Sequence, residues 1–362
     1  LAQDLKVATY HPLKDMRVTF KQSDTPGQVD ANVKVVDAEP DNFAVILSNT
    51  GNDETGDYRL TGSYQHTNLF NKDHIINVSY TSSPGPWENV SQYGGSYRAP
   101  IYSQHAWVTA YYLKSDVDSG TVGDFNISGA GEMMGVHYLR NLKRIDRYEH
   151  WIDIGLDNKL FENDVLFGLL PTSLVPDVRS APVSLMYKGE FPWKDNLVEF
   201  YLQHSINTNM GSNNDSLSYT LTRLNADQDW SHWRYGASLN RPIKDWNLKL
   251  EFSGQYTQDA LITGEQFGIG GSSNVRGYEE REVAKDTGYS ITVEATSPQK
   301  DWFSGLGRMV GFFDYGSVRS QDVIPGDPPQ TQKLSSIGIG VRWQYQTNFL
   351  ASIDLAHALR DG

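Results

Sequence analysis

Apolar and polar residues alternate with a period of two along many short stretches of this 362-residue chain. Between 246 and 257, for example, Leu248, Leu250 and Phe252 share one face, and Lys249 and Glu251 share the other. A period of two predicts β-strands, and about nine to eleven residues is the length of a tilted strand that crosses a membrane. Polar residues this regular are costly inside a dry core. The pattern therefore indicates strands with one face toward lipid and one toward a wet lumen.

Fifteen such strands are predicted, separated by short turns such as 242–245 and by long loops such as 207–229. Single-chain bacterial barrels have an even number of strands and leave no edge unpaired in lipid. Because Arg360-Asp361-Gly362 is typical of a turn, we infer that a sixteenth strand has been lost beyond it; fourteen strands with one false assignment is the alternative. The predicted strands lie near 43–49, 57–67, 74–83, 91–100, 104–114, 130–140, 148–158, 181–190, 196–206, 231–241, 246–257, 287–297, 308–317, 334–345 and 348–357.

The composition favours the same class of fold. The chain is polar on average, with a mean hydropathy of −0.50, yet it is rich in aromatic residues and glycine. No apolar run approaches the roughly 18 residues that a membrane helix needs. These features are typical of an all-β transmembrane β-barrel, in which the lipid and lumen faces average out. A soluble β-sandwich or propeller is the alternative, although no repeat of fixed blade length is present.

Charge and cysteine content exclude several functions. The formal net charge of −13 disfavours nucleic acid as a partner. The absence of cysteine excludes disulfides and thiolate metal sites. The sequence starts at Leu1 without a signal-peptide pattern, so we interpret it as a mature or trimmed chain.

Residues 1–41 differ from the barrel-like remainder, 42–362. A segment from Asp30 to Pro40 alternates like a strand, and Met16 to Phe20 forms a second short one. About forty residues hardly make an independent core. We predict that this region is the end of a small α/β domain whose beginning is missing.

Enzymatic chemistry is not predicted. His204 and Ser205 are adjacent on a strand and so point to opposite faces. No Gly-x-Ser-x-Gly elbow is present, and the nine histidines form no metal-binding pair. Asp153 and Asp157 share a strand face, as acids on a lumen wall often do. We therefore predict no catalytic residues, no metal and no cofactor.

The region from Gly264 to Gly316 contains the strongest candidate site. A glycine-rich loop holds one arginine, Arg276, and the strand that follows holds Asp314 among its polar positions. We hypothesise that the loop folds back so that these two residues pair inside the barrel. The alternative is a chance match on a mobile surface loop.

Several motifs together resemble the TpsB family, the outer-membrane transporters of two-partner secretion, within the superfamily of barrel-assembly proteins. The match extends in order over roughly residues 26 to 357. The segments are Asn49-Thr50-Gly51 with Thr55-Gly56-Asp57-Tyr58-Arg59, Asn68-Leu69-Phe70 with Asp73 and Ser79 to Pro84, Tyr97 to Tyr102 with Ser115 to Gly120, Val275-Arg276-Gly277-Tyr278, and Phe313-Asp314-Tyr315-Gly316. The last two of these segments resemble the signature motifs of the superfamily.

The resemblance implies a 16-stranded barrel preceded by two periplasmic POTRA domains, with residues 1–41 as the end of the second. Such a barrel lies in the outer membrane of a Gram-negative bacterium, surrounded by lipid, and we expect a monomer. It moves a large TpsA-type exoprotein, unfolded and without ATP, across that membrane. The chain departs from the family pattern by lacking the N-terminal plug helix, the first POTRA domain and the last strand.

The loop 258–286 is expected to occupy the lumen, with Phe267 and Tyr278 packed beside the arginine. Arg276 suits a bidentate pair with a carboxylate, and Glu294 is the second candidate partner. An assembly factor of the same superfamily and a passive porin remain alternatives. The cargo, whether adhesin, haemolysin or contact-dependent toxin, is left open. The predicted loop–barrel lock consists of Arg276, Asp314, Gly277, Tyr278, Val275, Phe313, Gly316 and Glu294.

Overall fold

The computed structural model describes most of the chain, and the following account concerns these residues alone. They are 14–23, 29–37, 39–51, 56–85, 90–116, 120–122, 125–127, 130–162, 175–323, 326 and 329–359. Parts of the predicted domain remnant (1–13, 24–28 and 38), Thr55 of the first motif and the predicted turn at 360–362 lie outside them.

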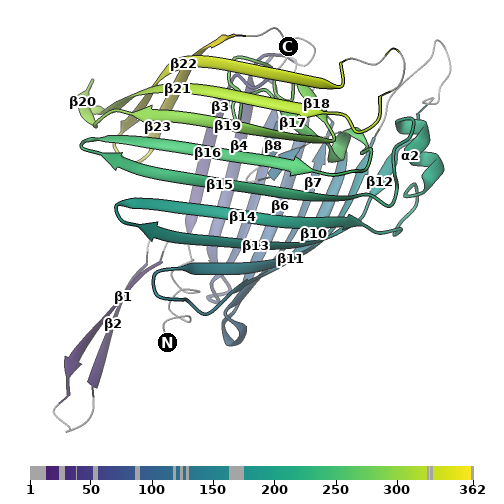
Figure 1. Cartoon of the computed structure of the whole chain (residues 1–362). Coiled ribbons are helices and arrows are strands. Elements are labelled where there is room, and N and C mark those ends of the chain that lie inside the picture. The colour runs from purple at the N-terminus through teal and green to yellow at the C-terminus, as the bar shows by residue number, and fades with distance from the viewer. Residues whose placement is uncertain are drawn as a thin grey trace.

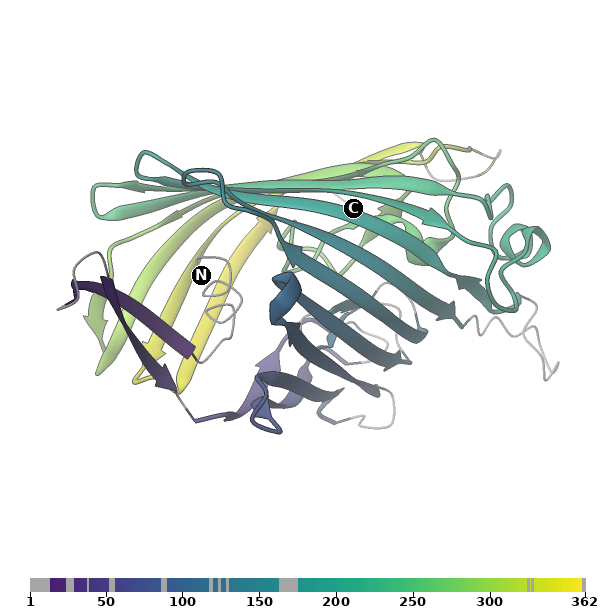
Figure 2. The ribbon, with the colours of Figure 1, turned by 90° about the horizontal axis from the view of Figure 1, so that it is seen from below.

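Fifteen long strands form the wall of a β-barrel (Figure 1), and Figure 2 shows how this sheet curves around. Each follows one of the predicted strands, with ends that differ by no more than three residues. The strands are β3 (Asp41–Ser48), β4 (Arg59–Leu69), β5 (His74–Ser82), β6 (Gln92–Ile101), β7 (Ala106–Ser115), β10 (Gly131–Asn141), β11 (Glu149–Phe161), β13 (Pro182–Trp193), β14 (Asn196–Asn207), β15 (Ser231–Ile243), β16 (Trp246–Tyr256), β19 (Thr287–Thr296), β21 (Gly305–Arg319), β22 (Thr331–Tyr345) and β23 (Phe349–Ala358).

The wall is built from neighbours in chain order, each paired antiparallel to the next from β3 to β23. Two-residue turns such as Lys194–Asp195 and Lys244–Asp245 close hairpins at one end, with Lys194 and Lys244 at positive φ. The longer connections gather at the other end, together with helix α2 (Ser216–Thr222) (Figure 1). The short-turn and long-loop ends therefore separate as the sequence predicts.

The two faces of the wall differ in chemistry. On β16, Leu250 and Phe252 are exposed on the outside, whereas Gln255 is fully buried on the inside. The same pattern repeats on β22, where Ile337 and Ile339 face outward and Ser336 inward. An apolar exterior around a polar interior is the arrangement of a transmembrane β-barrel.

The seam between β23 and β3 is the exception in this wall. The strand order of the closed barrel places them side by side as hydrogen-bonded neighbours, and the seam differs from the rest of the wall in the exposure of its side chains. Adjacent residues of β3, Val45 and Ile46, are 78% and 54% exposed, although they point to opposite faces. In Figure 2 the yellow β23 and the purple β3 lie on either side of this seam.

Smaller elements complete the described structure, and the alternation pattern did not predict most of them. β1 (Lys14–Gln22) and β2 (Val29–Asp37) form an antiparallel hairpin that projects from the short-turn end (Figure 1). β8 (Gly120–Val122) pairs with β9 (Phe125–Ile127), and β12 (Val178–Ser180) and β20 (Lys300–Trp302) extend the wall. A 3₁₀ turn, η2 (Tyr102–Gln104), links β6 to β7. Among the described residues, no helix has the length and apolar character to cross a membrane.

The largest apolar cluster lies inside the long-loop end of the barrel, where it joins wall strands to two loops. Leu113, Met133 and Phe161 belong to the wall, Tyr219 belongs to α2, and Leu261 belongs to the loop between β16 and β19. All five are buried. The loops at this end therefore pack into the barrel, and the loop after β16 is the one that carries the predicted arginine.

Candidate functional site

The loop that connects β16 to β19 consists of a stalk and a tip. In the stalk, which we define as 258–269 and 283–286, η3 (Thr263–Glu265) precedes β17 (Phe267–Ile269), and β17 pairs with β18 (Val283–Lys285). The tip is the segment 270–282 that this ladder closes. It starts at Gly270 and Gly271, whose φ angles of 107° and 95° suit glycine. At its far end, Arg281 N donates to Gly270 O at 3.4 Å.

Arg276 attaches the tip to the inner wall of the barrel. Its Nε and Nη2 donate to the two oxygens of Asp314 on β21 at 2.7 and 2.9 Å, and its backbone N–H donates to the same carboxylate at 3.2 Å. Its Nη1 donates to Glu294 on β19 at 3.0 Å and lies 3.6 Å from Asp354 on β23. The arginine therefore contacts both carboxylates considered from the sequence and a third that was not. We call this set the tip anchor.

The tip anchor is largely shielded from water. Asp314 is 0% exposed and the Arg276 side chain 11%. The guanidinium also stacks on Phe312, with 3.4 Å between its carbon and the ring centroid. Phe312 shares the inward face of β21 with Asp314, whereas Phe313 is 41% exposed on the outward face. Assigning Phe313 to the lock is thus wrong for its side chain, because neighbouring residues on a strand alternate between faces.

The other predicted residues of the tip give it shape. Val275 is fully buried in a small apolar cluster with Ile269, against which Tyr278 also packs. A Cβ added at Gly316 of β21 would lie 2.9 Å from Ile269 and 3.1 Å from Val275, so glycine makes room for the tip. The Tyr278 hydroxyl donates to Ser335 O on β22 at 2.9 Å.

Gly277 and Phe267 also lie where the loop hypothesis requires. Gly277 has φ of 93°, and its added Cβ would lie 3.0 Å from Ala356 on β23. Phe267 packs against the apolar cluster of Val275. The tip thus contacts β19, β21, β22 and β23.

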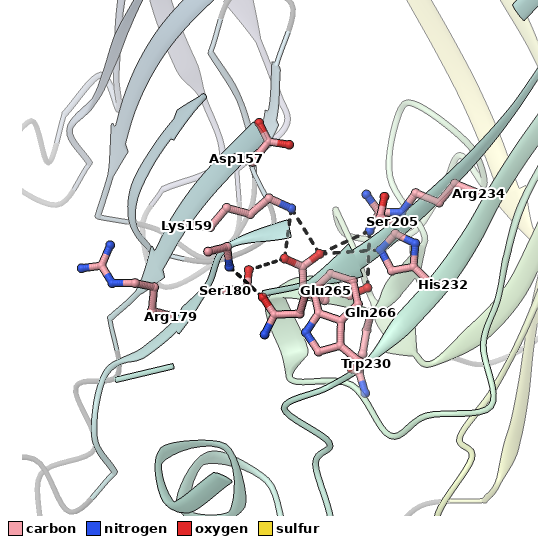
Figure 3. A network of polar contacts seen from close by, with 12 residues as sticks. Asp157, Lys159, Arg179, Ser180, Ser205, Trp230, His232, Arg234, Glu265 and Gln266 are labelled. Carbon is pink, nitrogen blue, oxygen red and sulfur yellow. Dashed lines mark hydrogen bonds and ion pairs between the residues drawn. The ribbon is translucent and has the colours of Figure 1, made fainter. Parts of the chain in front are cut away.

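A second polar network holds the stalk to a different part of the wall (Figure 3). Glu265, at the end of η3, is 0% exposed. Lys159 on β11 donates to both of its oxygens at 3.0 and 3.2 Å, and the Ser180 hydroxyl on β12 donates at 2.6 Å. Arg234 and His232 on β15 each lie 3.9 Å from the carboxylate. We call this set the stalk anchor.

The charge of the stalk carboxylate is stabilised by its neighbours. Burial raises the pKa of the Glu265 carboxyl, but Lys159, His232 and Arg234 together lower it by more, so its pKa lies below its ordinary value. Gln255 on β16 donates to the backbone oxygens of both Glu265 and Asp286, at 3.0 and 2.9 Å. The two limbs of the stalk are therefore joined at one wall position.

Asp286 links the stalk to the neighbouring loop 208–230. Arg223, just after α2, donates to both of its carboxylate oxygens at 2.5 and 3.0 Å. The backbone N–H groups of Leu261 and Gln321 donate to the same carboxylate, both at 2.8 Å. This arrangement is consistent with the buried apolar contacts between Tyr219 of α2 and the stalk.

Sequence reasoning missed the stalk anchor because no short motif marks it. Glu265 and Lys159 are 106 residues apart, and single charged residues are common on lumen walls. One signal was available: Glu265 stands alone as an acid in a stretch of small and apolar residues, where a carboxylate needs a buried partner.

Two cavities adjoin the loop inside the barrel. One, of about 570 Å³, lies between the loop and the wall and is lined by residues such as His137, Gln203, Arg234 and Glu280. The other, of about 400 Å³, is bordered by Asn274 of the tip and by strands β11 to β19. The loop therefore lies within a polar lumen that it partly fills.

The residues tested for enzymatic chemistry serve other contacts. The His204 ring packs on Trp233, 4.3 Å between centroids, on the face opposite to buried Ser205. Asp153 and Asp157 both bind the His137 ring, at 2.7 and 3.1 Å. In the described part of the chain, no group of three or more metal-ligating side chains is placed to hold an ion.

An antiparallel barrel with an apolar exterior and a loop bound across its polar lumen defines a class, the transmembrane β-barrels whose pore is occupied by their own loop. Residues 27–343 match the family model described as "Haemolysin secretion/activation protein ShlB/FhaC/HecB", and the chain belongs to this family. The predicted relationship to the TpsB transporters is thereby confirmed.

Two relatives agree with this assignment. Heme/hemopexin transporter protein HuxB of Haemophilus influenzae strain Rd is 22% identical over 343 residues, and that of strain 86-028NP is 21% identical. Each alignment covers 92% of this chain but only 59% of the relative, so the chain spans less than two thirds of these proteins.

The solved structures share the fold at low sequence identity. CdiB from Escherichia coli has a TM-score of 0.82 at 16% identity, covering 99% of this chain and 67% of that one. CdiB from Acinetobacter baumannii has 0.70 at 17%, covering 98% and 63%. BamA from Haemophilus ducreyi lacking POTRA domains 1–3 has 0.60 at 12%, covering 99% and 74%.

Proposed function

We propose that this chain forms the pore of an outer-membrane transporter that secretes a TpsA-type exoprotein, in unfolded form and without ATP. The observation that carries the proposal is the tip anchor, in which Arg276 of a lumen loop binds Asp314 of the wall. A plain porin needs no loop attached at both walls of its lumen. Membership of the secretion family supports the same function, and HuxB, a relative, is named a heme/hemopexin transporter protein.

The proposed role of the lock is conformational. Arg276, Asp314, Glu294 and the small residues Gly277 and Gly316 hold the tip across the lumen, and the exoprotein passes when it moves. No step of this mechanism is catalytic. Folding of the exoprotein outside the cell supplies the driving force.

The complete barrel, in this proposal, has sixteen strands. All described neighbours are antiparallel, so with fifteen strands β3 and β23 run in the same direction and cannot continue the pattern across the seam. One further strand would pair antiparallel with both. Because an unpaired edge is costly in lipid, the exposed side chains at this seam support the even count.

We further propose that residues 1–41 are the end of a periplasmic POTRA domain and that 42–362 belong to the barrel. The hairpin β1–β2 projects from the short-turn end of the barrel (Figure 1), and in this proposal that end faces the periplasm. An exposed strand edge in such a domain can pair with an extended client segment through main-chain hydrogen bonds. The transporter acts as a monomer surrounded by outer-membrane lipid.

A secretion assay tests this function. The full-length protein is produced with the exoprotein encoded beside its gene, and the secreted exoprotein is measured in the medium with and without the transporter. We expect secretion to require it. An exoprotein released equally well without the transporter, or no effect of removing residues 270–282, would leave the proposal without support.

An assembly factor for other barrels is the second candidate, because the BamA structure shares the fold. The larger TM-score of the CdiB structure favours the transporter. Depletion of the protein distinguishes the two: an assembly factor would reduce the level of unrelated outer-membrane barrels, whereas a transporter would reduce only its exoprotein outside the cell.

A further inference from the structure

The stalk and the tip of the lumen loop bind the wall through separate sets of ionic contacts. The β17–β18 ladder closes the stalk, and the glycines at 270 and 271 begin the tip with backbone conformations that other residues rarely adopt. The tip is joined to the stalk by the backbone bond from Arg281 to Gly270 and by side-chain bonds such as those in which Asn274 Nδ2 donates to Gly268 O at 3.2 Å and Arg281 Nη2 donates to Thr263 O at 3.1 Å. These bonds connect the two parts of the loop to each other and not to the wall.

The ionic contacts of the two parts go to different strands, although Ile269 and Val283 of the stalk also pack against Val318 of β21. Among the described residues, the polar contacts of Arg276 are with β19, β21 and β23, whereas the Glu265 carboxylate binds β11 and β12 and lies near β15. No residue takes part in both sets. Contacts that share no member are expected to break independently.

We propose that Glu265 is a positioning residue that holds the stalk to the β11–β15 wall independently of the tip anchor. The role of this anchor during secretion rests on the proposed function, whereas the anchor itself does not. Opening of the Arg276 contacts then releases residues 270–282 while the stalk stays in place. A translocating polypeptide would displace the tip and pass beside β19–β23, with the stalk remaining across the other side of the lumen.

The chemistry of the stalk anchor supports a fixed role. Its carboxylate is completely buried, and removing one member of a buried pair leaves the other charge without compensation. After loss of Lys159, the Ser180 hydroxyl is the one described group left within hydrogen-bond distance of the carboxylate oxygens, because Arg234 and His232 are 3.9 Å away. Lys159 is therefore the residue whose replacement tests the anchor without altering the loop.

The absence of cysteine from the sequence allows a direct test with single introduced thiols. Gln266→Cys reports on the stalk and Val275→Cys on the tip; each native residue is buried and lies next to its anchor. The full chain is reconstituted in liposomes, and the rate of reaction with a water-soluble maleimide is measured. Each reporter is combined with Lys159→Met, which breaks the stalk anchor, or Asp314→Asn, which weakens the tip anchor.

We expect Lys159→Met to accelerate labelling of Gln266→Cys by about tenfold or more and to leave Val275→Cys within about twofold. Asp314→Asn should have the opposite selectivity. Lys159→Arg keeps the positive charge, so labelling at Gln266→Cys should be slow in this variant. If Lys159→Met acted only by a general loss of packing, the charge of the replacement would not matter. Heat-dependent gel migration verifies that each barrel is folded, and if Lys159→Met does not assemble, Lys159→Gln is labelled in its place.

Acceleration of both reporters by either change would show that the loop moves as one body and would overturn the proposal. Unchanged labelling at Gln266→Cys after loss of the Lys159 charge would do the same. No exoprotein is present in this experiment. Its result therefore stands apart from the secretion assay that tests the proposed function.

Discussion

The tip anchor and the stalk anchor are inverse solutions to the same problem of attaching a loop inside a barrel. At the tip, one loop cation, Arg276, lies among three wall carboxylates, whereas at the stalk one loop carboxylate, Glu265, lies among Lys159, Arg234 and His232. Each anchor has one wholly buried carboxylate, Asp314 or Glu265, and its nearest cation is only slightly exposed, 11% for Arg276 and 16% for Lys159. The two anchors therefore differ in which side carries the positive charge and in the wall strands that they bind, and at both of them removing one partner leaves a buried charge without compensation.

The largest expected effect comes from breaking the tip anchor on its loop side. Arg276→Ala leaves Asp314 buried without the cation that binds it, beside two other carboxylates, and breaking a buried pair costs about 3–5 kcal/mol, less where water enters. Asp314→Ala is expected to be milder, since Arg276 keeps Glu294 at 3.0 Å. In a secretion assay with the full-length protein, Arg276→Ala should reduce the secreted exoprotein at least about tenfold, and Asp314→Ala less.

Arg241→Ala, at an exposed residue of β15, is the matched control and should secrete normally. Both anchor variants should still fold, because the closed backbone ladder holds the barrel. The expected difference between the two variants would be refuted if Asp314→Ala reduced secretion as much as Arg276→Ala. Adding Asp314→Ala to Arg276→Ala should cause little further loss, because the two residues share one interaction.

Breaking the stalk anchor should affect stability more than secretion. Glu265→Ala leaves Lys159, Arg234 and His232 without their carboxylate. The Glu265 side chain that it removes is 0% exposed, whereas the Arg276 side chain of the tip anchor is 11% exposed. The temperature at which the folded gel band converts to the unfolded one should fall further for Glu265→Ala than for Arg276→Ala. Glu280→Ala removes a tip carboxylate that accepts hydrogen bonds from Ser272 within the tip itself, and it serves as the control. An unchanged conversion temperature for Glu265→Ala would argue against a distinct stalk anchor.

A smaller effect is expected from the glycine that makes room for the tip. Gly316→Ala places a methyl group against Ile269 and Val275, so the tip must shift by a few tenths of an ångström, and secretion should fall by about twofold to fivefold. Gly311→Ala on the same strand has nothing within 4 Å of the added Cβ and should behave as the unmodified protein. Equal behaviour of the two variants would mean that the tip tolerates displacement.

The smallest effect concerns pH. In the folded protein the pKa of the Glu265 carboxyl lies below its ordinary value of about 4.3. The carboxylate of the stalk anchor is therefore charged at every pH above that ordinary value. Its contribution to stability is lost only as the pH falls through the lowered pKa. Labelling at Gln266→Cys, corrected for the intrinsic reactivity of a free thiol, should be constant from pH 8 to about pH 5 and rise only in stronger acid. A rise near neutral pH would contradict the buried ion pair.

The strands and the tip anchor were accessible from sequence for different reasons. The period of two requires only local information, so all fifteen long strands appear within three residues of their predicted ends. Arg276 and Asp314 could be paired because each lies in a recognisable motif. The period of two places Phe313 on the outer face of the barrel, opposite to Asp314. Phe313 was assigned to the lock because it belongs to the same motif as Asp314, and the alternation predicts its side chain better than the motif does.

The alternation along this chain was enough by itself to determine the strands, their two faces and the ends at which short turns and long loops lie, because each depends on residues close in sequence. Only the tertiary structure decided which distant side chains meet. Glu265 with Lys159, Asp354 with Arg276, and Arg223 with Asp286 depend on the curvature and register of the whole wall and on the path of the loop through it. A buried charge needs a partner, but its position in the sequence does not specify which of many wall charges that partner is.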